Sequence, residues 1–411
     1  MSILKKTGTF FQVDLSYLLR GGFVLGIGHV TGTLLGFCLS LIFANYVDVA
    51  VYGQYKYIVS IAGILGAFTL SGVGTTILQS VAKGYDGTLF AEQKSYLKWS
   101  LISVVLSFFV GGYYIFKGDM PLGAGVIVAT LCSYVFNSLT LQNPFLSAKK
   151  DFKRLTINQI LNAGALLIIV SGAIFFGLKS ALWIIITYYG SQIFFQALTY
   201  IHMLRVYKPN ASVDPEDKHL SKHLSLGNII ISIAEYIDKI LIFQFFGPAQ
   251  VALYAFSVGV PDQIRGVNKM LGTLVVPKLS IKDAAGLHTS IFAHTQKYLI
   301  VSSAITLAFY FVAPYFFAFF FPAYVEAAAL ASLYMLLLPI TAMCTMHGYA
   351  IQIRRDVKSL YIIRFVDSMG KIILFIIFIP WLGVLGAILA ILISKLITAL
   401  LQIYLYHYNF K

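Results

Sequence analysis

Apolar runs about 20 residues long recur along the whole chain, and each is long enough for a helix to cross the hydrocarbon core of a bilayer. The runs are continuous, whereas the strands of a transmembrane barrel alternate apolar and polar residues. The sequence therefore predicts an all-α integral membrane protein with about twelve transmembrane helices. The predicted spans are residues 22–45, 55–78, 97–116, 121–143, 157–177, 181–204, 226–246, 250–276, 295–320, 327–350, 360–380 and 383–406.

The longest polar stretch between predicted spans is residues 205–224, which contains Pro209, Asn210 and Pro215. These residue types favour turns and loops over regular structure. The stretch divides the predicted spans evenly. We therefore expect two bundles of about six helices each, as in duplicated transporters. Their predicted boundaries are 1–204 for the N-terminal bundle, 205–224 for a cytoplasmic linker and 225–411 for the C-terminal bundle.

A short motif occurs once in each predicted half. Val51–Tyr55 reads Val-Tyr-Gly-Gln-Tyr and stands between the first two spans, and Val251–Tyr254 reads Val-Ala-Leu-Tyr and stands between the seventh and eighth. Together with the central linker, the two copies indicate related halves. Related halves with a substrate site at their interface are common in secondary transporters.

The basic residues fix the predicted orientation. The chain has 30 Lys and Arg against 16 Asp and Glu, a formal net charge of +14. Most of the basic residues fall in segments on one side of the predicted spans, and Lys56, Lys117 and Lys179 fall on the other. Cytoplasmic loops carry such an excess, so we predict that both termini are cytoplasmic. The net charge then matches anionic membrane lipids and needs no nucleic acid partner.

Charged residues also lie inside the predicted spans. A charge at the centre of a spanning helix costs about 2.5–3.5 kcal/mol on insertion scales, so such residues usually serve a function. The seventh, eighth and twelfth spans contain Glu235, Asp238, Lys239, Asp262, Arg265, Lys269 and Lys395.

Spacing along a helix suggests how these charges are balanced. Glu235 and Lys239 share a helix face at i and i+4, and Asp262 and Arg265 share one at i and i+3, so each pair can neutralise itself. Lys395, like Lys269, has no acid close by in sequence. An excess of cations would suit a diphosphate or an acidic glycan.

These patterns give two sets of candidate site residues. We predict that Arg265, Lys269, Lys395 and Lys239 bind the substrate. We predict that Asp238 or Glu235 couples transport to an ion, because desolvation favours the protonated form of a carboxyl group. The sequence has no spacing typical of a metal site, no disulfide framework and no phosphate-cradling GxxxxGK[ST] loop. We therefore expect neither a metal nor a cofactor.

Two further patterns have simple structural interpretations. Gly28, Gly32 and Gly36 are spaced by four in the first span, which predicts close packing against another helix. Arg364, Asp367 and Lys371 share a face of the eleventh span near its cytoplasmic end. For these we favour side chains that extend to the lipid headgroups.

Several short motifs resemble those of the polysaccharide-transport branch of the multidrug/oligosaccharidyl-lipid/polysaccharide exporter superfamily, and the O-antigen flippases in particular. The relevant residues are Asp238, Phe246-Gly247, Val251, Tyr254 and Val276–Ser280 in the second half, with Val51–Tyr55 and Gly72-Val73-Gly74 in the first. The chain departs from the family pattern at Ala252-Leu253, where a glycine often precedes the tyrosine. It also departs at Pro261-Asp262, which we expect to break the eighth span.

The resemblance implies a flippase of the bacterial inner membrane. Such proteins move undecaprenyl-diphosphate-linked oligosaccharide repeat units across the membrane by alternating access, for O-antigen, capsule or exopolysaccharide assembly. It further implies a MATE-like fold, in which two six-helix bundles enclose a V-shaped central cavity. The expected partners are the lipid-linked oligosaccharide, membrane lipids and the polysaccharide polymerase machinery.

Two alternatives stay open. One is an ion-coupled multidrug antiporter of the same superfamily, which would favour an acidic cavity over the cationic one expected here. The other is a membrane glycan polymerase or ligase, but such enzymes need a large outer loop and the predicted outer loops are short. We therefore expect a transporter and not an enzyme.

Overall fold

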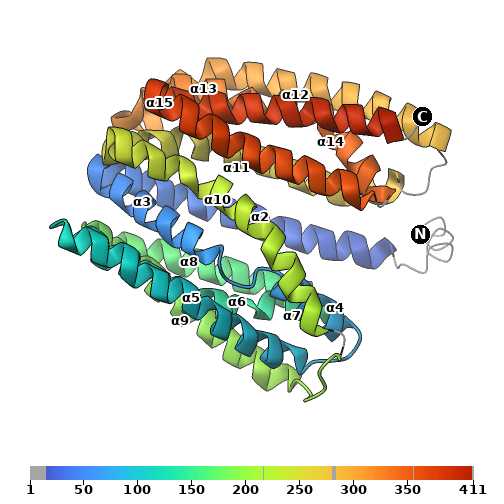
Figure 1. The fold of residues 1–411 in the computed structure, drawn as a ribbon, viewed down its shortest axis with the longest axis horizontal. Helices are drawn as coiled ribbons and strands as arrows, with labels where there is room; N and C mark the ends of the chain where they lie inside the picture. Colours follow the sequence, from blue (N-terminus) through green and yellow to red (C-terminus); the bar gives the residue numbers. More distant parts are fainter. Residues whose placement is uncertain (1–14, 216, 280–283, 355, 410–411) are drawn as a thin grey trace. The chain divides into compact units, whose positions relative to one another are not determined.

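The computed structural model describes the backbone of residues 15–215, 217–279, 284–354 and 356–409, and the side chains of 24–215, 228–266, 291–354 and 356–408. All regular structure in this part of the chain is helical (Figure 1). The prediction of an all-α protein is therefore confirmed.

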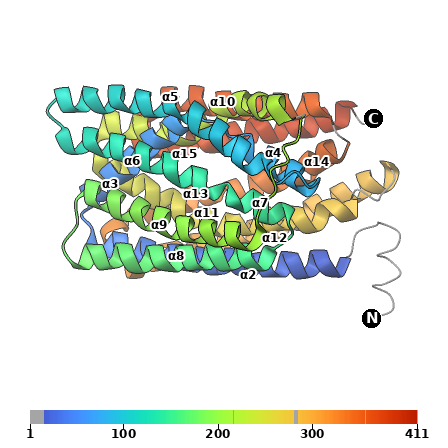
Figure 2. The ribbon, with the colours of Figure 1, turned by 90° about the horizontal axis from the view of Figure 1, so that it is seen from below.

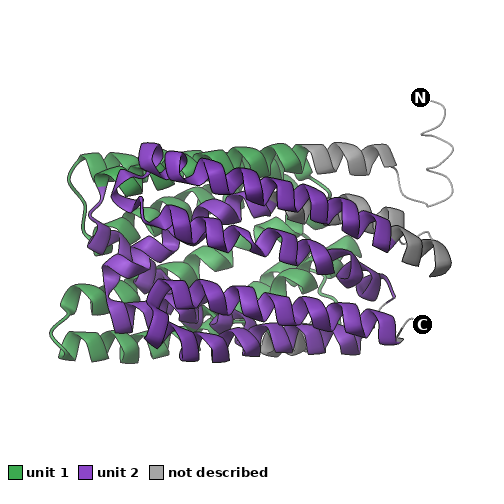
Figure 3. Cartoon of the chain, turned by 90° about the horizontal axis from the view of Figure 1, so that it is seen from above, with its two compact units in different colours: residues 1–46, 65–228 green, residues 47–64, 229–411 purple. Residues whose placement is uncertain are grey.

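Contacts divide the chain into two compact units (Figure 3). Unit 1 comprises residues 1–46 and 65–228, and unit 2 comprises residues 47–64 and 229–411. The predicted boundaries at 1–204, 205–224 and 225–411 follow the order of the spans along the chain and stay a prediction. The described helices that begin in unit 1 are α2 (Leu15–Tyr46), α4 (Val73–Ala82), α5 (Thr88–Phe116), α6 (Met120–Thr140), α7 (Gln142–Ala148), α8 (Phe152–Phe175), α9 (Ala181–Tyr207) and α10 (Asp217–Phe246).

Unit 2 takes up most of α10 and all the helices that follow it. These are α11 (Pro248–Leu279), α12 (Ala284–Phe320), the 3₁₀ turn Pro322–Tyr324, α13 (Ala327–Met335), α14 (Leu337–Ile353) and α15 (Val357–Asn409). Unit 2 also contains nearly all of α3 (Val49–Gly66), although α3 precedes α4 in the chain.

Within unit 1, α2 packs along α8, α5 along α6, and α9 lies against both α6 and α8 (Figure 2). Within unit 2, α14 packs against α12 and α15, and α11 contacts α13, α14 and α15. Among the described residues, eight helical segments are long and apolar enough to cross a membrane. The protein is thus a multi-pass membrane protein.

The last of these segments contains two of the predicted spans. Residues 357–408 form two helical legs: Pro380 lies between their ends, and Gly383 has φ 59° and ψ −132°, values outside the helical region. Proline removes a backbone donor, and glycine adopts positive φ without strain from a side chain. The chain therefore bends here into two legs, at the position where the sequence predicts a tight turn between residues 380 and 383.

The predicted span 55–78 is corrected by the structure. The chain forms two helices, α3 and α4, with turns between them at residues 67–72. Helix α3 begins earlier than predicted because Asp48 caps it: Oδ1 of Asp48 accepts from the backbone N–H of Ala50 at 2.8 Å. Val51–Tyr55 therefore lies in the first turns of α3, not in a loop.

The second motif also lies in a helix, since Val251–Tyr254 is in the first turns of α11. The first motif packs on α11 at residues that flank the second: Gly53 lies against the backbone of Pro248, and the rings of Tyr52 and Phe256 stack at 4.9 Å. Helix α11 also continues through Pro261, so the expected break at Pro261-Asp262 is wrong.

The connection between α9 and α10 lies within the predicted linker and packs on the rest of unit 1. Helix α9 extends to Tyr207 and α10 begins at Asp217. Between them, the buried carboxylate of Asp214 pairs with Lys83 at 3.0 Å and accepts from Ser80 at 3.2 Å. Asn210 donates to the carbonyl of Gly84 at 2.9 Å. These contacts hold the connection against the turn between α4 and α5.

Candidate functional site

A cavity of about 260 Å³ inside unit 2 contains most of the charged residues predicted for the site. It is lined by Ala234, Glu235, Asp238 and Lys239 of α10, Tyr254, Val258, Asp262 and Arg265 of α11, Tyr334 of α13, Leu337 of α14, and Lys371, Phe375, Ile391 and Lys395 of α15. We call it the charged cavity. Four helices thus direct ionisable side chains or tyrosine hydroxyls to one place.

The α10 side of the charged cavity is organised around Asp238. Its carboxylate is buried, pairs with Lys239 Nζ at 3.1 Å, and accepts a hydrogen bond of 2.6 Å from the Tyr254 hydroxyl. Lys239 Nζ also lies 5.6 Å from the centre of the Tyr254 ring. The predicted pair of Glu235 with Lys239 is wrong, because the described Lys239 pairs with Asp238. Glu235 is instead exposed and lines the cavity.

The α11 side contains the predicted pair of Asp262 and Arg265, which is confirmed with Nη1 and Oδ1 2.5 Å apart. The Tyr334 hydroxyl lies 3.0 Å from each of these atoms, accepting from Arg265 and donating to Asp262. Arg265 Nε is buried and has no hydrogen-bond partner among the described residues. Tyr334 is therefore a site residue that the sequence analysis does not identify.

On the α15 side, Lys395 has no acid close by in sequence but pairs with an acid from the other leg of the helix. Lys395 Nζ lies 3.0 Å from Asp367 Oδ1, and Lys371 Nζ lies 3.7 Å from Asp367 Oδ2. Thr398 donates to the same carboxylate at 3.2 Å. The bend near Gly383 folds the second leg of α15 back against the first, so residues 28 positions apart in sequence become neighbours.

Asp367 is therefore a site residue that sequence reasoning missed. The interpretation that Asp367 and Lys371 extend to the headgroups is wrong, because Lys371 lines the charged cavity and Asp367 holds it there. The spacing of Asp367 and Lys371 at i and i+4 was the available signal. Arg364, on the same leg, is exposed. Lys269 lies in α11, but its side chain is outside the described residues.

The charges of the cavity are balanced. Lys239, Arg265, Lys371 and Lys395 face three lining carboxylates, and Asp367 supplies a fourth. The described cations are each paired, so the expected surplus of unpaired cations is absent from this part of the chain. Balance is required physically, because an unpaired ion in a low-dielectric interior is costly. No group of three potential metal ligands occurs among the described residues.

The family assignment follows from the sequence of this same chain. The family described as "Polysaccharide biosynthesis protein" matches residues 18–281, which is more than half of the chain and includes the α10 and α11 sides of the charged cavity. The chain belongs to this polysaccharide biosynthesis family. No curated protein matches it.

Solved structures support the same fold for this family member. A lipid II flippase, MurJ, in an inward closed conformation matches with a TM-score of 0.66 and 15% identity, over 94% of this chain and 87% of that one. A multidrug resistance MATE family transporter of the MOP superfamily, inward-facing, matches with a TM-score of 0.62 and 15% identity, over 97% and 94%.

A third structure is a MOP superfamily transporter from Pyrococcus furiosus, described as having a binding pocket of reversed polarity. It matches with a TM-score of 0.57 and 14% identity, over 96% of this chain and 95% of that one. At such identities the likeness shows the fold alone. The predicted MOP superfamily resemblance and the MATE-like transporter fold are therefore confirmed.

Proposed function

We propose that this polysaccharide biosynthesis family protein is a flippase for undecaprenyl-diphosphate-linked oligosaccharides, acting by alternating access in the bacterial inner membrane with both termini in the cytoplasm. The observation that carries the proposal is the charged cavity, where four cationic side chains meet inside unit 2. A diphosphate needs several cations, because arginine offers a planar pair of donors and lysine a point charge. The product would serve O-antigen, capsule or exopolysaccharide assembly.

The carboxylates of the cavity fit this role as exchangeable partners. Without substrate, Asp238, Asp262 and Asp367 keep the cations paired, which avoids the large penalty of an isolated buried ion. An entering diphosphate would take over the cations and release the carboxylates. Binding therefore exchanges one set of ion pairs for another and leaves no cation unpaired at any stage.

Among the individual residues, Arg265 is the best candidate for direct phosphate contact. Its Nε is buried and has no partner among the described residues, so the guanidinium can still donate to an added oxygen. We propose that Lys239 and Lys395 assist from the two neighbouring helices, with Lys269 below Arg265 on α11. We propose that Asp238, or the exposed Glu235, has the ion-coupling role, because both carboxylates line the same cavity as the cations.

A second candidate is an ion-coupled multidrug antiporter. The observation in its favour is the charge balance, because a cavity with as many carboxylates as cations also suits a cationic cargo. The two candidates differ in what accumulates when the protein is missing. A glycan polymerase or ligase is the third and weakest, since the turns at residues 117–119 and 176–180 are too short to form an outer active site.

Deletion of the gene separates these candidates. We expect lipid-linked oligosaccharide to accumulate on the cytoplasmic face and surface polysaccharide to be lost, both restored by the wild-type gene. Arg265→Gln should restore less than about a tenth of the polysaccharide, since one charge-assisted contact contributes about 1.5–3 kcal/mol. Arg205→Gln, at the end of α9 in unit 1, is the matched control and should restore it fully. Drug sensitivity with normal surface polysaccharide would support the antiporter instead.

A further inference from the structure

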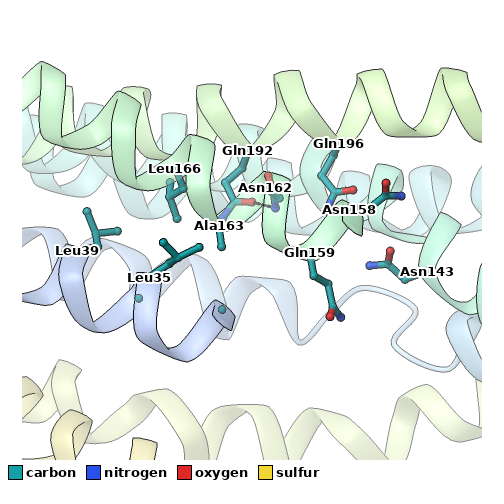
Figure 4. A pocket seen from close by; sticks show the side chains of 12 residues that line it. Leu35, Leu39, Asn143, Asn158, Gln159, Asn162, Ala163, Leu166, Gln192 and Gln196 are labelled. Atoms are coloured by element: carbon teal, nitrogen blue, oxygen red, sulfur yellow. Dashed lines mark hydrogen bonds between the residues drawn. The ribbon is translucent and has the colours of Figure 1, made fainter. Parts of the chain in front are cut away.

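Unit 1 contains its own cavity, of about 210 Å³, and none of the residues that line it is charged (Figure 4). Six of its twelve lining residues are carboxamides: Asn143 of α7, Asn158, Gln159 and Asn162 of α8, and Gln192 and Gln196 of α9. The other six are glycine, alanine or leucine, namely Gly32, Leu35, Gly36 and Leu39 of α2 with Ala163 and Leu166 of α8. We call it the amide cavity.

The amides meet because of their spacing. Asn158 and Asn162 are at i and i+4 of α8, and Gln192 and Gln196 are at i and i+4 of α9, so each helix presents two amides on one face. Asn162 donates to Gln192 Oε1 across the two helices at 2.5 Å. Gln142, at the start of α7, donates to Gln196 Oε1 at 2.6 Å. These bonds fix the orientation of part of the cluster.

Other amide atoms remain without partners. Asn158 Nδ2 and Asn162 Oδ1 are buried and make no hydrogen bond with any described residue. A buried polar group without a partner destabilises a protein by about 1–3 kcal/mol, so such groups are rarely kept without a ligand. One is a donor and the other an acceptor, which matches a hydroxyl group because a hydroxyl both accepts and donates.

The two glycines of α2 make this space. A Cβ atom added at Gly32 or Gly36 would meet nothing within 4 Å, whereas one added at Gly28 would press on Thr156. The predicted close packing along the glycine stripe therefore holds for Gly28 only. At Gly32 and Gly36, the missing side chains leave the amide cavity open.

We infer that the amide cavity binds an uncharged sugar residue of the transported lipid. None of its lining residues is ionisable, so it does not suit a phosphate. Its volume exceeds the roughly 150 Å³ of an apolar cavity known to hold benzene, so a six-membered ring with hydroxyl substituents has room. Sites built to hydrogen-bond a hydroxyl discriminate strongly against ligands that lack it. The inference rests on the proposed function and adds a site in unit 1 that recognises the sugar.

The test compares two lipids on purified protein in lipid nanodiscs. One is bare undecaprenyl diphosphate, and the other is the lipid-linked oligosaccharide extracted from cells that lack the gene. We expect wild-type protein to bind the sugar-bearing lipid at least about tenfold more tightly. Gly36→Leu should fill the amide cavity and remove this difference while leaving the affinity for the bare lipid unchanged.

Gly190→Leu is the matched control, since Gly190 is an exposed glycine of α9 that also has open space around it and lies outside the cavity. It should behave as wild type. Asn162→Leu gives a second, independent variant with the phenotype of Gly36→Leu, and the thermal unfolding temperature of each variant checks its folding.

The outcomes separate the inference from the proposed function. If wild-type protein binds neither lipid, the proposed function fails. If it binds both lipids equally, or if well-folded Gly36→Leu and Asn162→Leu keep the full preference for the sugar-bearing lipid, the flippase proposal stands and the amide cavity is not a sugar site.

Discussion

At the scale of single residues, Asp367 is the side chain on which the α15 side of the charged cavity depends. Its two carboxylate oxygens hold Lys395 and Lys371, and Thr398 donates to one of them. The carboxylate is partly buried, with 20% of the side chain exposed, so the pairing is only partly screened by solvent. In the proposed exchange, Asp367 competes with the diphosphate for both lysines.

Asp367→Asn tests this competition. The amide keeps the shape and one acceptor oxygen but removes the charge, so both lysines become available to an anion. We expect undecaprenyl diphosphate to bind about tenfold more tightly, equivalent to about 1.4 kcal/mol. The same change should lower the free energy of unfolding by about 1–3 kcal/mol, because the lysines lose their counter-charge. Equilibrium binding and thermal unfolding of the purified protein measure the two effects.

Asp119→Asn is the control for that substitution. Asp119 caps α6 in unit 1 by accepting from the backbone N–H of Leu122, and asparagine caps helices about as well as aspartate, so this substitution removes a carboxylate charge without touching the charged cavity. It should leave the affinity unchanged. Weaker binding of the diphosphate by Asp367→Asn than by wild type would mean that Asp367 positions the two lysines for binding and does not compete with the diphosphate for them.

At the scale of elements, the placement of α3 in unit 2 depends on Gly53. Helix α3 packs against α10 through the stacked rings of Tyr57 and Phe243, 3.7 Å apart, and through a hydrogen bond of 2.7 Å from Gln244 to the Tyr57 hydroxyl; Gly53 brings it against Pro248 of α11. Gly53 allows this approach because a methyl group there would overlap the carbonyl of Pro248. Glycine is therefore needed at position 53 so that α3 can pack closely against the start of α11.

Gly53→Ala should separate α3 from the start of α11. Because the overlap is with backbone atoms, which cannot rotate away, we expect a loss of more than about 3 kcal/mol in the free energy of unfolding. Gly66→Ala, at the end of the same helix, has open space around it and should be neutral or slightly stabilising. Thermal unfolding in detergent measures both. Equal stability of the two variants would mean that the contact with Pro248 does not hold α3 in place.

The sequence predicts the helices themselves better than it predicts the contacts between them. Long apolar runs predicted the spanning helices well, because a helix in lipid needs a length and an apolar composition that are visible in the sequence. The sequence does not show which residues pack against a given face of a helix. Spacing placed Gly28, Gly32 and Gly36 on one face, but only the folded chain shows that Thr156 packs on the first and that the others open into a cavity.

The candidate site was predictable to the same limit. Ion pairs within one helix turn, such as Asp262 with Arg265, follow from spacing. The pair of Lys395 with Asp367 depends on the bend at Gly383, and the contact of Tyr334 with Arg265 joins different helices. The amide cavity was missed because single Asn and Gln residues in spans give no signal until α8 and α9 bring them together.

At the scale of the whole molecule, orientation in the membrane follows from the ends of the unit 1 helices. At one end, the α4–α5 turn, the α7–α8 turn and the residues after α9 contact one another. Lys149 pairs with Asp86 at 2.6 Å, and Tyr207 donates to Asp151 at 2.6 Å. Burial alone would raise the pKa of Asp151, but the Tyr207 hydroxyl and the nearby Arg154 hold it below its ordinary value. This end contains Lys83, Lys149, Lys150, Lys153, Arg154 and Lys208.

The opposite end of these helices consists of two short turns that contain Lys117 and Lys179. A bias of basic residues toward one end predicts that this end faces the cytoplasm.

Single cysteines at Lys150 and Lys179, placed in a protein lacking Cys38, Cys132 and Cys344, test the orientation with a membrane-impermeant maleimide. We expect the cysteine at 179 to react in intact cells with a permeable outer membrane, and the cysteine at 150 to react only after the inner membrane is opened. Both positions are exposed lysines between helices, so the two cysteines are comparably accessible within the protein. The reverse pattern would place the amide cavity, which lies about 9–15 Å along α8 from the basic end, in the outer half of the membrane. It would then meet the sugar after translocation and not before it.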